Sequence, residues 1–226
     1  MLDDKYIEYL EQFVSENRRN LFQKVLNERT RHFTVAIEDI FQPHNSSAVV
    51  RSCDIFGIQD VHIIENRYKF YASNRVAKGA QKWLNFSVYN KRGSNNTAAC
   101  IAALRKKDYQ IIATTPHNDS CLLSDFDINK KSAFFFGVEK EGLSSEVLDN
   151  ADGFLKIPMV GFTESLNISV AASIILQRLT EILKMSDVKW ALSAKEKKEL
   201  YLDWMQKSIK SIDKIKTYYY SEKASQ

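Results

Sequence analysis

Three segments of the chain combine polar side chains with nearby glycine or proline residues. They are HNSSAVVRSCDIFG at 44–57, FFFGVEKEGLSSEV at 134–147 and IPMVGFTESLNISVAASIILQRL at 157–179. Their candidate side chains for chemistry are Asn45, Arg51, Glu139, Ser165 and Asn167. An arginine, a carboxylate, a hydroxyl and two amides can orient a substrate and assist the loss of a proton from it.

The first segment predicts a helix. Asn45 is a natural N-cap, and Gly57 suits the position just after a helix ends. The apolar residues form one arc of this helix, and Arg51 falls at the edge of the arc. Arg51 is therefore placed to reach a neighbouring element or another subunit, although an ion pair at the rim of the helix explains the position equally well.

The second and third segments place polar groups beside flexible turns. Gly137 and Gly142 let the backbone approach a ligand closely, and Glu139 directly follows a predicted strand. In the third segment Ser165 or Asn167 can cap a helix that begins in apolar surroundings. Capping explains either residue, but not both together with the nine-residue loop at 158–166.

Composition excludes several classes of protein. The chain has 226 residues, 44% hydrophobic and 27% charged, which predicts a folded globular domain with a sizeable core. Without an apolar run of membrane-spanning length or an apolar N-terminal leader, we expect a cytoplasmic protein. The three cysteines lack a C-x-x-C spacing and the four histidines lack metal-ligand spacing, so we expect no disulfide framework and no metal.

Net positive charge is concentrated at residues 189–226, and basic residues also gather late in the otherwise balanced segment 1–32. Residues 189–226 hold nine lysines against five acids, 9 − 5 = +4, which equals the whole net charge. This pattern favours a polyanionic partner, with solvated helix faces as the alternative. The candidate contacts to such a partner are Arg18, Arg19, Arg29, Arg31, Lys207 and Lys210.

Short apolar runs alternate with helical patterns through the middle of the chain. Strands are predicted at 33–37, 61–64, 109–114, 133–138 and 154–157, and helices at 4–28, 45–56, 95–107, 144–150, 167–185 and 194–216. This order indicates a parallel sheet covered on both faces, with a ligand site beyond the carboxyl ends of the strands. We divide the chain into a helical extension at 1–32, an α/β domain at 33–186 and a basic helical extension at 187–226.

Taken in order, the three polar segments resemble the motifs of the SpoU (TrmH) family of RNA 2′-O-ribose methyltransferases, within the SPOUT superfamily. The similarity covers roughly residues 30–185. The resemblance implies a parallel-sheet fold whose C-terminal part threads a deep trefoil knot. It also implies a homodimer and S-adenosylmethionine as the cofactor.

The resemblance further implies roles for individual residues. Positions that contact the cofactor, largely through backbone, match Thr114, Gly137, Ile157 and Leu166. Catalytic or active-site positions match Asn45, Arg51, Glu139, Ser165 and Asn167. We interpret Arg51 as the group that orients a ribose 2′-hydroxyl and an adjacent phosphate, because a guanidinium hardly deprotonates.

Within the family, PHNSSA, GAQKW at 79–83 and SLNISVA are most similar to bacterial enzymes that methylate a guanosine of the tRNA D-loop. Gln81 and Glu164 depart from that pattern, in which histidine and glutamine are usual. We therefore expect tRNA as the substrate, with ribosomal RNA and a non-catalytic RNA-binding role as alternatives. The basic ends would contact RNA backbone, and the tyrosines at 218–220 would either stack on unpaired bases or belong to a frayed tail.

Overall fold

A computed structural model describes residues 4–71, 73–116, 120–138 and 141–224. The chain divides into two compact units, one made of Thr30–Trp190 and the other of Met1–Arg29 together with Ala191–Gln226. The two terminal segments, which the sequence suggested as separate extensions, therefore form one unit.

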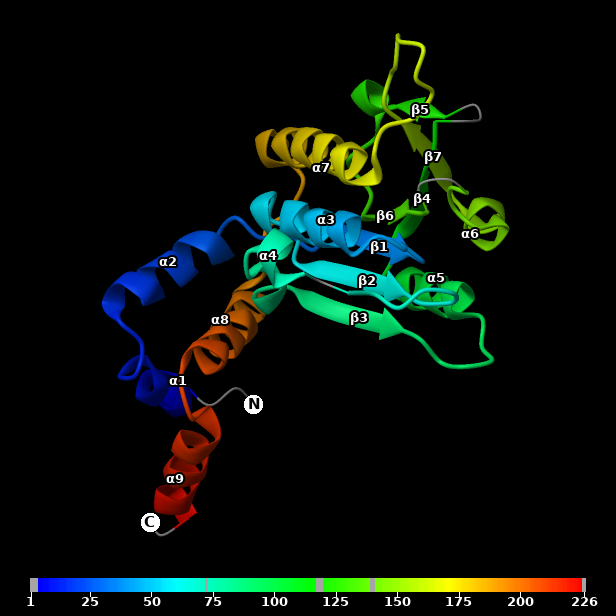
Figure 1. The fold of residues 1–226 in the computed structure, drawn as a ribbon. Coiled ribbons are helices and arrows are strands. Elements are labelled where there is room, and N and C mark those ends of the chain that lie inside the picture. The colour runs from blue at the N-terminus through cyan, green and yellow to red at the C-terminus, as the bar shows by residue number, and fades with distance from the viewer. Residues whose placement is uncertain (1–3, 72, 117–119, 139–140, 225–226) are drawn as a thin grey trace. The chain divides into compact units, whose positions relative to one another are not determined.

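A seven-stranded parallel sheet is the framework of the unit Thr30–Trp190, in the part of it that the structure describes. The strand order is β3-β2-β1-β6-β4-β7-β5 (Figure 1). The strands are β1 (Phe33–Glu38), β2 (Asp60–Ile64), β3 (Asn85–Tyr89), β4 (Gln110–Thr114), β5 (Cys121–Leu122), β6 (Ser132–Phe136) and β7 (Gly153–Lys156). The predicted parallel sheet is thus confirmed, although β3 and β5 were not foreseen.

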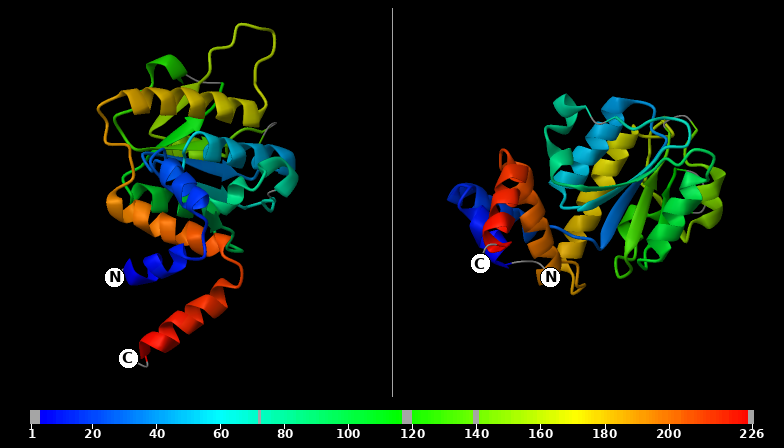
Figure 2. Two further views of the ribbon diagram at one scale, coloured as in Figure 1. Left: turned by 90° about the vertical axis from the view of Figure 1, so that its left-hand side faces the viewer. Right: turned by 90° about the horizontal axis from the view of Figure 1, so that it is seen from below.

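Helices cover both faces of this sheet. They are α3 (Pro43–Ile55), α4 (Asn74–Ala77), α5 (Asn96–Arg105), α6 (Ser145–Asn150) and α7 (Ile168–Met185), with short 3-10 turns η1 (Ala80–Lys82) and η2 (Leu123–Asp125). The helices α3 and α7 lie on one face, and α5 and α6 lie on the other (Figure 2).

The central strands are buried on both faces, which explains their continuous apolar sequences. Every residue of β1 and β6 is buried. Phe134 and Phe136 belong to the hydrophobic cluster under α3 and α7, and Phe135 belongs to the cluster under α5 and α6. Alternate residues of one strand therefore fill two cores, as expected for a parallel sheet between helix layers.

Helix boundaries follow local chemistry that the sequence reveals only in part. Gly57 follows α3 with a positive φ of 81°, as predicted for a residue just after a helix. The prediction that Asn45 caps α3 is wrong. The helix begins at Pro43, after Gln42 as N-cap, because proline at the first helical position lacks only an amide that would have no partner there.

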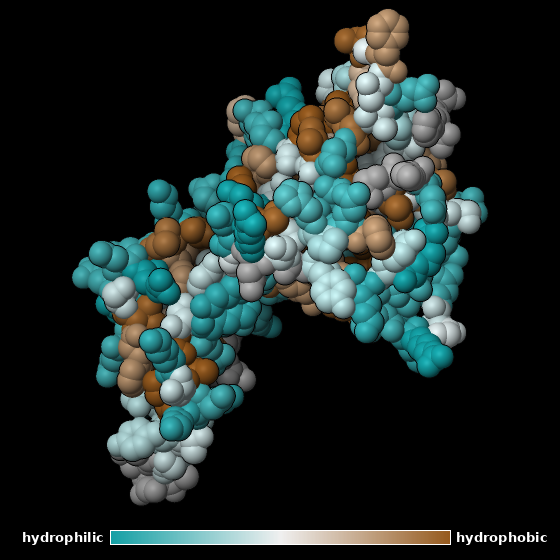
Figure 3. Space-filling model, viewed as in Figure 1, coloured by the Kyte–Doolittle hydropathy of each residue, from teal (hydrophilic) through white to brown (hydrophobic). Residues whose placement is uncertain are grey.

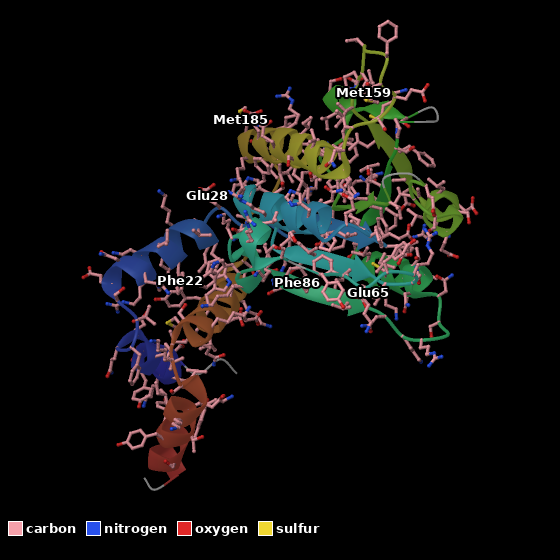
Figure 4. All side chains as sticks on the ribbon, in the orientation of Figure 1. Phe22, Glu28, Glu65, Phe86, Met159 and Met185 are labelled. Carbon is pink, nitrogen blue, oxygen red and sulfur yellow. The ribbon has the colours of Figure 1, made fainter. Side chains whose placement is uncertain are left out.

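The second unit is helical, with α1 (Asp4–Glu11), α2 (Glu16–Leu26), α8 (Ala194–Ser208) and α9 (Ile212–Ala224). Each of the two helices predicted here is interrupted. Ser15 precedes the start of α2, and Ser211 adopts a φ of 56° between α8 and α9. Phe22, labelled in Figure 4, packs edge-on against Trp204 at 5.7 Å between ring centroids.

Candidate active site

A pocket of about 250 Å³ opens at the carboxyl ends of the central strands. Its walls are formed by residues 114–116 after β4, by 136–138 and 141–143 after β6, by 155–157 with Met159 after β7, and by Ser165, Leu166 and the first turns of α7. Met159, labelled in Figure 4, lies in the loop after β7. This is the edge of the sheet that the sequence predicted for a ligand.

The turn after β6 requires glycine at position 137. A Cβ atom added to Gly137 would lie 2.2 Å from the carbonyl oxygen of Gly142 and 2.7 Å from the nitrogen of Leu143. Val138 and Gly142 exchange two backbone hydrogen bonds, of 2.9 and 2.8 Å, which hold the turn closed. Gly137 therefore permits a close approach of two backbone segments at the pocket wall.

Backbone groups make up much of the neighbouring wall. The hydroxyl of Thr114 donates to the carbonyl of Phe135 at 2.6 Å, and the amide of Thr115 donates to the carbonyl of Leu155 at 3.1 Å. These bonds tie β4 to β6 and β7 where the strands end. The Thr114 hydroxyl is thus occupied by a hydrogen bond within the sheet, and Thr114 lines the pocket.

The start of α7 is joined to the start of α3 through two amides. The side-chain oxygen of Asn167 accepts the amide hydrogen of Ser169 at 2.9 Å, so Asn167 is the N-cap of α7. Its Nδ2 donates to Oδ1 of Asn45 at 3.2 Å. Further along the same helices, the hydroxyls of Ser52 and Ser173 lie 2.7 Å apart, so α3 and α7 run side by side in the same direction.

Arg51 lies away from this pocket in the described chain. It is exposed on α3 and lines a second concavity together with His44, Arg75 and Lys78. Arg51 follows Asn45 by six residues, which is about 9 Å along the axis of an α-helix. The pocket contains Thr114, Gly137, Ile157, Ser165 and Leu166, whereas Glu139 lies outside the described residues.

A buried carboxylate holds the end of the turn after β6, and the sequence analysis did not identify it. Glu38, at the end of β1, is 2% exposed. Its carboxylate accepts from the amide of Ser144 at 2.9 Å, from the hydroxyl of Ser144 at 2.7 Å and from the hydroxyl of Thr97 at 2.6 Å. Glu38 therefore holds the segment that leads from the 137–143 turn into α6. An acid directly after the apolar run of β1 is the signal that points to it.

The loop after β2 reaches the same turn. Asp39, with a φ of 50°, accepts the amides of Asn66 and Arg67 at 2.8 Å each. Arg67 in turn donates to Glu141, which lines the pocket, at 2.5 Å between Nη1 and Oε2. Because both partners are about half exposed, this pair contributes little stability, and its value is to position the loop.

The candidate contacts to RNA backbone differ in their exposure. Arg18 and Lys210 are exposed. Arg31 and Lys207 form ion pairs with Asp60 and Asp203 at 3.0 and 2.6 Å, and Arg19 lies 3.6 Å from Glu11. The prediction for Arg29 requires correction, because Arg29 is 2% exposed and lies over the ring of Trp204 at 5.5 Å. The Arg29 side chain packs inside the protein and does not lie at the surface, where a contact with RNA backbone would need it.

The tyrosines near the C-terminus belong to a helix. Tyr219 packs against Tyr6 and Tyr9 with ring centroids 5.0 and 4.9 Å apart. Tyr218 and Tyr220 are about half exposed. This arrangement contradicts a frayed tail over Ile212–Ala224, and stacking on RNA bases stays a prediction for the exposed rings.

Two further findings concern the described residues only. None of their helices is long and apolar enough to cross a membrane. They also contain no group of three or more histidine, cysteine, aspartate or glutamate side chains able to hold a metal ion.

The fold and the pocket define a class, that of parallel α/β proteins that bind a small molecule at the carboxyl ends of their strands. Residues 32–177 match the sequence pattern of the SpoU rRNA Methylase family. The chain belongs to this family.

Relatives agree with this assignment. The chain is 39% identical to the tRNA (guanosine(18)-2'-O)-methyltransferase of Borreliella burgdorferi over 207 residues, 92% of this chain and 93% of that protein. It is 35% identical to the enzyme of the same name from Thermus thermophilus, over 72% of this chain and 81% of that protein.

Solved structures share the fold. The TrmH/SpoU tRNA modifying enzyme of Aquifex aeolicus matches with a TM-score of 0.74 and 27% identity, over 85% of this chain and 97% of that one. The SpoU methyltransferase AviRb of Streptomyces viridochromogenes, solved in complex with AdoMet, matches with a TM-score of 0.61 and 23% identity, over 72% and 65%. The latter similarity concerns the fold alone.

Proposed function

We propose that this protein transfers a methyl group from S-adenosylmethionine to the ribose 2′-oxygen of guanosine 18 in tRNA. The observation that carries the proposal is the pocket at the carboxyl ends of β4, β6 and β7, which gathers Gly137, Ile157, Ser165 and Leu166. The names of the relatives support tRNA and guanosine 18 over ribosomal RNA.

The residues of the pocket suit S-adenosylmethionine. Leu143, Leu155, Ile157 and Leu166 offer apolar surface for an adenine ring, and the strand ends offer backbone donors and acceptors for polar atoms. Gly137 allows the backbone to close tightly at the wall. When bound, the cofactor supplies an electrophilic methyl group on a sulfonium.

The polar candidates would prepare the other reactant. Arg51 presents a fixed fork of donors that can hold a ribose hydroxyl and a neighbouring phosphate. The hydroxyl proton would pass to that phosphate or to water as the oxygen is methylated. Asn45 and Asn167, hydrogen-bonded to each other, would hold the start of α3 against the loop that contains Ser165. Glu139 stays a candidate from the sequence alone.

We also propose a homodimer. Apolar side chains are exposed along one side of α7 and in the preceding loop, and Figure 3 shows this apolar surface over α7. Val170 is 45% exposed, Ile174 38% and Phe162 108%. An apolar surface of this kind is typical of a subunit contact. Within one chain, Arg51 is separated from the pocket. In a dimer, the Arg51 of one chain would reach the pocket of the other, so each site would combine two chains.

The remaining expectations follow from this role. A cytoplasmic location and the knot implied by the family resemblance stay proposals, as does independence from a metal. The alternative of a non-catalytic RNA-binding protein is distinguished by calorimetry, since a protein that only binds RNA has no need of S-adenosylmethionine.

The test is methyl transfer itself. The protein is incubated with methyl-labelled S-adenosylmethionine and total tRNA, and the labelled nucleotide is mapped. We expect 2′-O-methylguanosine at position 18. Label in ribosomal RNA and not in tRNA would favour the alternative substrate, and S-adenosylmethionine binding without any transfer would contradict the proposal.

A further inference from the structure

A second concavity on α3 gathers positive charge. Its volume is about 520 Å³, and its lining comes from α3 and from the segment of α4 beside it (Figure 1). The charged or titratable side chains of this lining are His44, Arg51, Arg75 and Lys78, and the lining contains no carboxylate. Arg51, Arg75 and Lys78 carry full positive charge at neutral pH, so the concavity is suited to an anion.

These three cations lack partners among the described residues. Neither an ion pair nor a hydrogen bond joins Arg51, Arg75 or Lys78 to another described side chain. Other arginines of the same unit are paired, as Arg31 is with Asp60 and Arg178 with Glu181. Unpaired cations repel one another, and an anion between them removes that repulsion.

The segment that contains Arg75 and Lys78 is anchored. The hydroxyl of Ser46 donates to the carbonyl of Tyr71 at 3.1 Å, and the amide of Ser73 donates to the hydroxyl of Ser47 at 2.7 Å. On the other side, Nε2 of Gln59 donates to the carbonyl of Trp83 at 3.0 Å. These bonds fix the segment against α3 before it and against β2 after it.

The backbone of Lys78 is also unusual. Its φ is 51°, in the left-handed region that costs a non-glycine residue free energy, and Gly79 follows with a φ of 86°. The surrounding anchors therefore hold a lysine in a conformation that its own preferences do not favour. Such positions occur at ligand sites more than elsewhere.

We propose that Arg51, Arg75 and Lys78 together bind a phosphodiester group of the substrate RNA, adjacent to the ribose at which Arg51 acts. This inference rests on the proposed function for the identity of the anion as RNA. Two guanidinium forks and one ammonium match the oxygens of a phosphate. Contacts of this kind position the strand without reading its bases. Their loss should therefore weaken the binding of every tRNA to a similar extent.

The test is the salt dependence of tRNA binding by the double variant Arg75→Ala/Lys78→Ala. Affinity for an unmodified tRNA transcript is measured by fluorescence anisotropy over a series of salt concentrations. We expect the slope of log affinity against log salt to become shallower by about 1 to 2, and the affinity at low salt to fall by about tenfold. Affinity for S-adenosylhomocysteine, measured by calorimetry, should be unchanged, because neither residue lines the other pocket.

Lys106→Ala is the matched control. Lys106 is an exposed lysine that directly follows α5, on the opposite face of the sheet. Its variant should keep the parent's slope. A double variant with the slope and the tRNA affinity of the parent would overturn the proposal. A double variant that binds inorganic phosphate more weakly than the parent but binds tRNA equally well would also overturn it.

The binding assay separates this inference from the proposed function. If the double variant loses the expected part of the slope while the parent protein transfers no methyl group, the phosphate site stands and the proposed reaction fails. If the parent methylates tRNA and the double variant binds tRNA as the parent does, the reaction stands and the phosphate site fails. A parent protein without affinity for tRNA contradicts both.

Discussion

At the scale of single residues, we expect Gly137 to link backbone geometry to cofactor binding. In Gly137→Ala the new Cβ atom would meet the carbonyl oxygen of Gly142 at 2.2 Å, so the turn must open. We expect affinity for S-adenosylhomocysteine, measured by calorimetry, to fall at least about tenfold, a loss of about 1.4 kcal/mol.

Gly161→Ala is the matched control, since the nearest atom to a Cβ there is the nitrogen of Thr163 at 4.0 Å. Both glycines belong to the segments that surround the pocket or lead into it. Equal affinity in the parent and in Gly137→Ala would show that the turn does not shape the pocket.

His62 makes stability depend on pH. It is buried in β2, and burial lowers the pKa of its imidazole to about 4. The unfolded chain therefore binds a proton near pH 6.5 that the folded chain binds only near pH 4. Titration of His62 should leave the free energy of unfolding unchanged above pH 7. As the pH decreases from 6.5 to 4, it should lower the free energy of unfolding by up to about 3 kcal/mol.

Chemical denaturation at several pH values measures this effect. His62→Gln cannot take up the proton, so its stability should decline less between pH 6.5 and 4 than that of the parent. Parallel curves for parent and variant would contradict the assigned cause.

At the scale of elements, Glu38 connects β1 to the start of α6. In Glu38→Gln an amide replaces an oxygen that accepts from Ser144 or Thr97, leaving a buried donor opposite another donor. We expect a loss of about 2 to 3 kcal/mol in the free energy of unfolding, together with weaker binding of S-adenosylhomocysteine.

Glu146→Gln serves for comparison, because Glu146 bonds to the exposed Asn95 at 2.8 Å. Its effect on the free energy of unfolding should stay within about 0.5 kcal/mol. If the two variants were equally stable, the buried network would not position the turn.

The elements also show how far the sequence leads. Continuous apolar runs were sufficient for the buried strands β1 and β6, because both faces are covered. The strand β3 was missed because it lies at the edge of the sheet and is only partly buried. The break between α1 and α2 was missed because the apolar spacing continues through Phe13 and Val14, while the break depends on Ser15.

The candidate site was predictable where chemistry lies on turn residues. Glycine and proline after strands indicated the pocket wall, and Asn167 was one of the two residues predicted to cap α7. The separation of Arg51 from the pocket and the role of Glu38 depend on packing between distant segments, which spacing along the chain does not contain. Arg75 and Lys78 were missed for the same reason.

At the scale of the whole molecule, the proposed dimer depends on the exposed side of α7. Val170→Glu/Ile174→Glu places charge on that surface, and we expect sedimentation at micromolar concentration to show a monomer. Lys106→Glu changes charge at an exposed position on the opposite face of the sheet and should leave the dimer intact. A double variant that still sediments as a dimer would exclude this surface as the contact.

If each site combines two chains, as proposed, mixing of variants measures it. With S-adenosylmethionine kept below its dissociation constant for the parent, Arg51→Ala and Gly137→Ala should each have little activity alone. If Arg51 acts on the partner's pocket, mixed dimers contain one intact site of two, and an equal mixture should recover about a quarter of parent activity. No recovery from verified mixed dimers would place Arg51 and the pocket of one chain in the same site.

The central claim is that this pocket directs a methyl group to a ribose oxygen of tRNA. Its most direct test compares two synthetic tRNAs that differ only in the sugar at guanosine 18, ribose in one and 2′-deoxyribose in the other, with methyl-labelled S-adenosylmethionine. We predict stoichiometric label in the first and none in the second. Label in the deoxy tRNA at the level of the first, or in neither, would contradict the account.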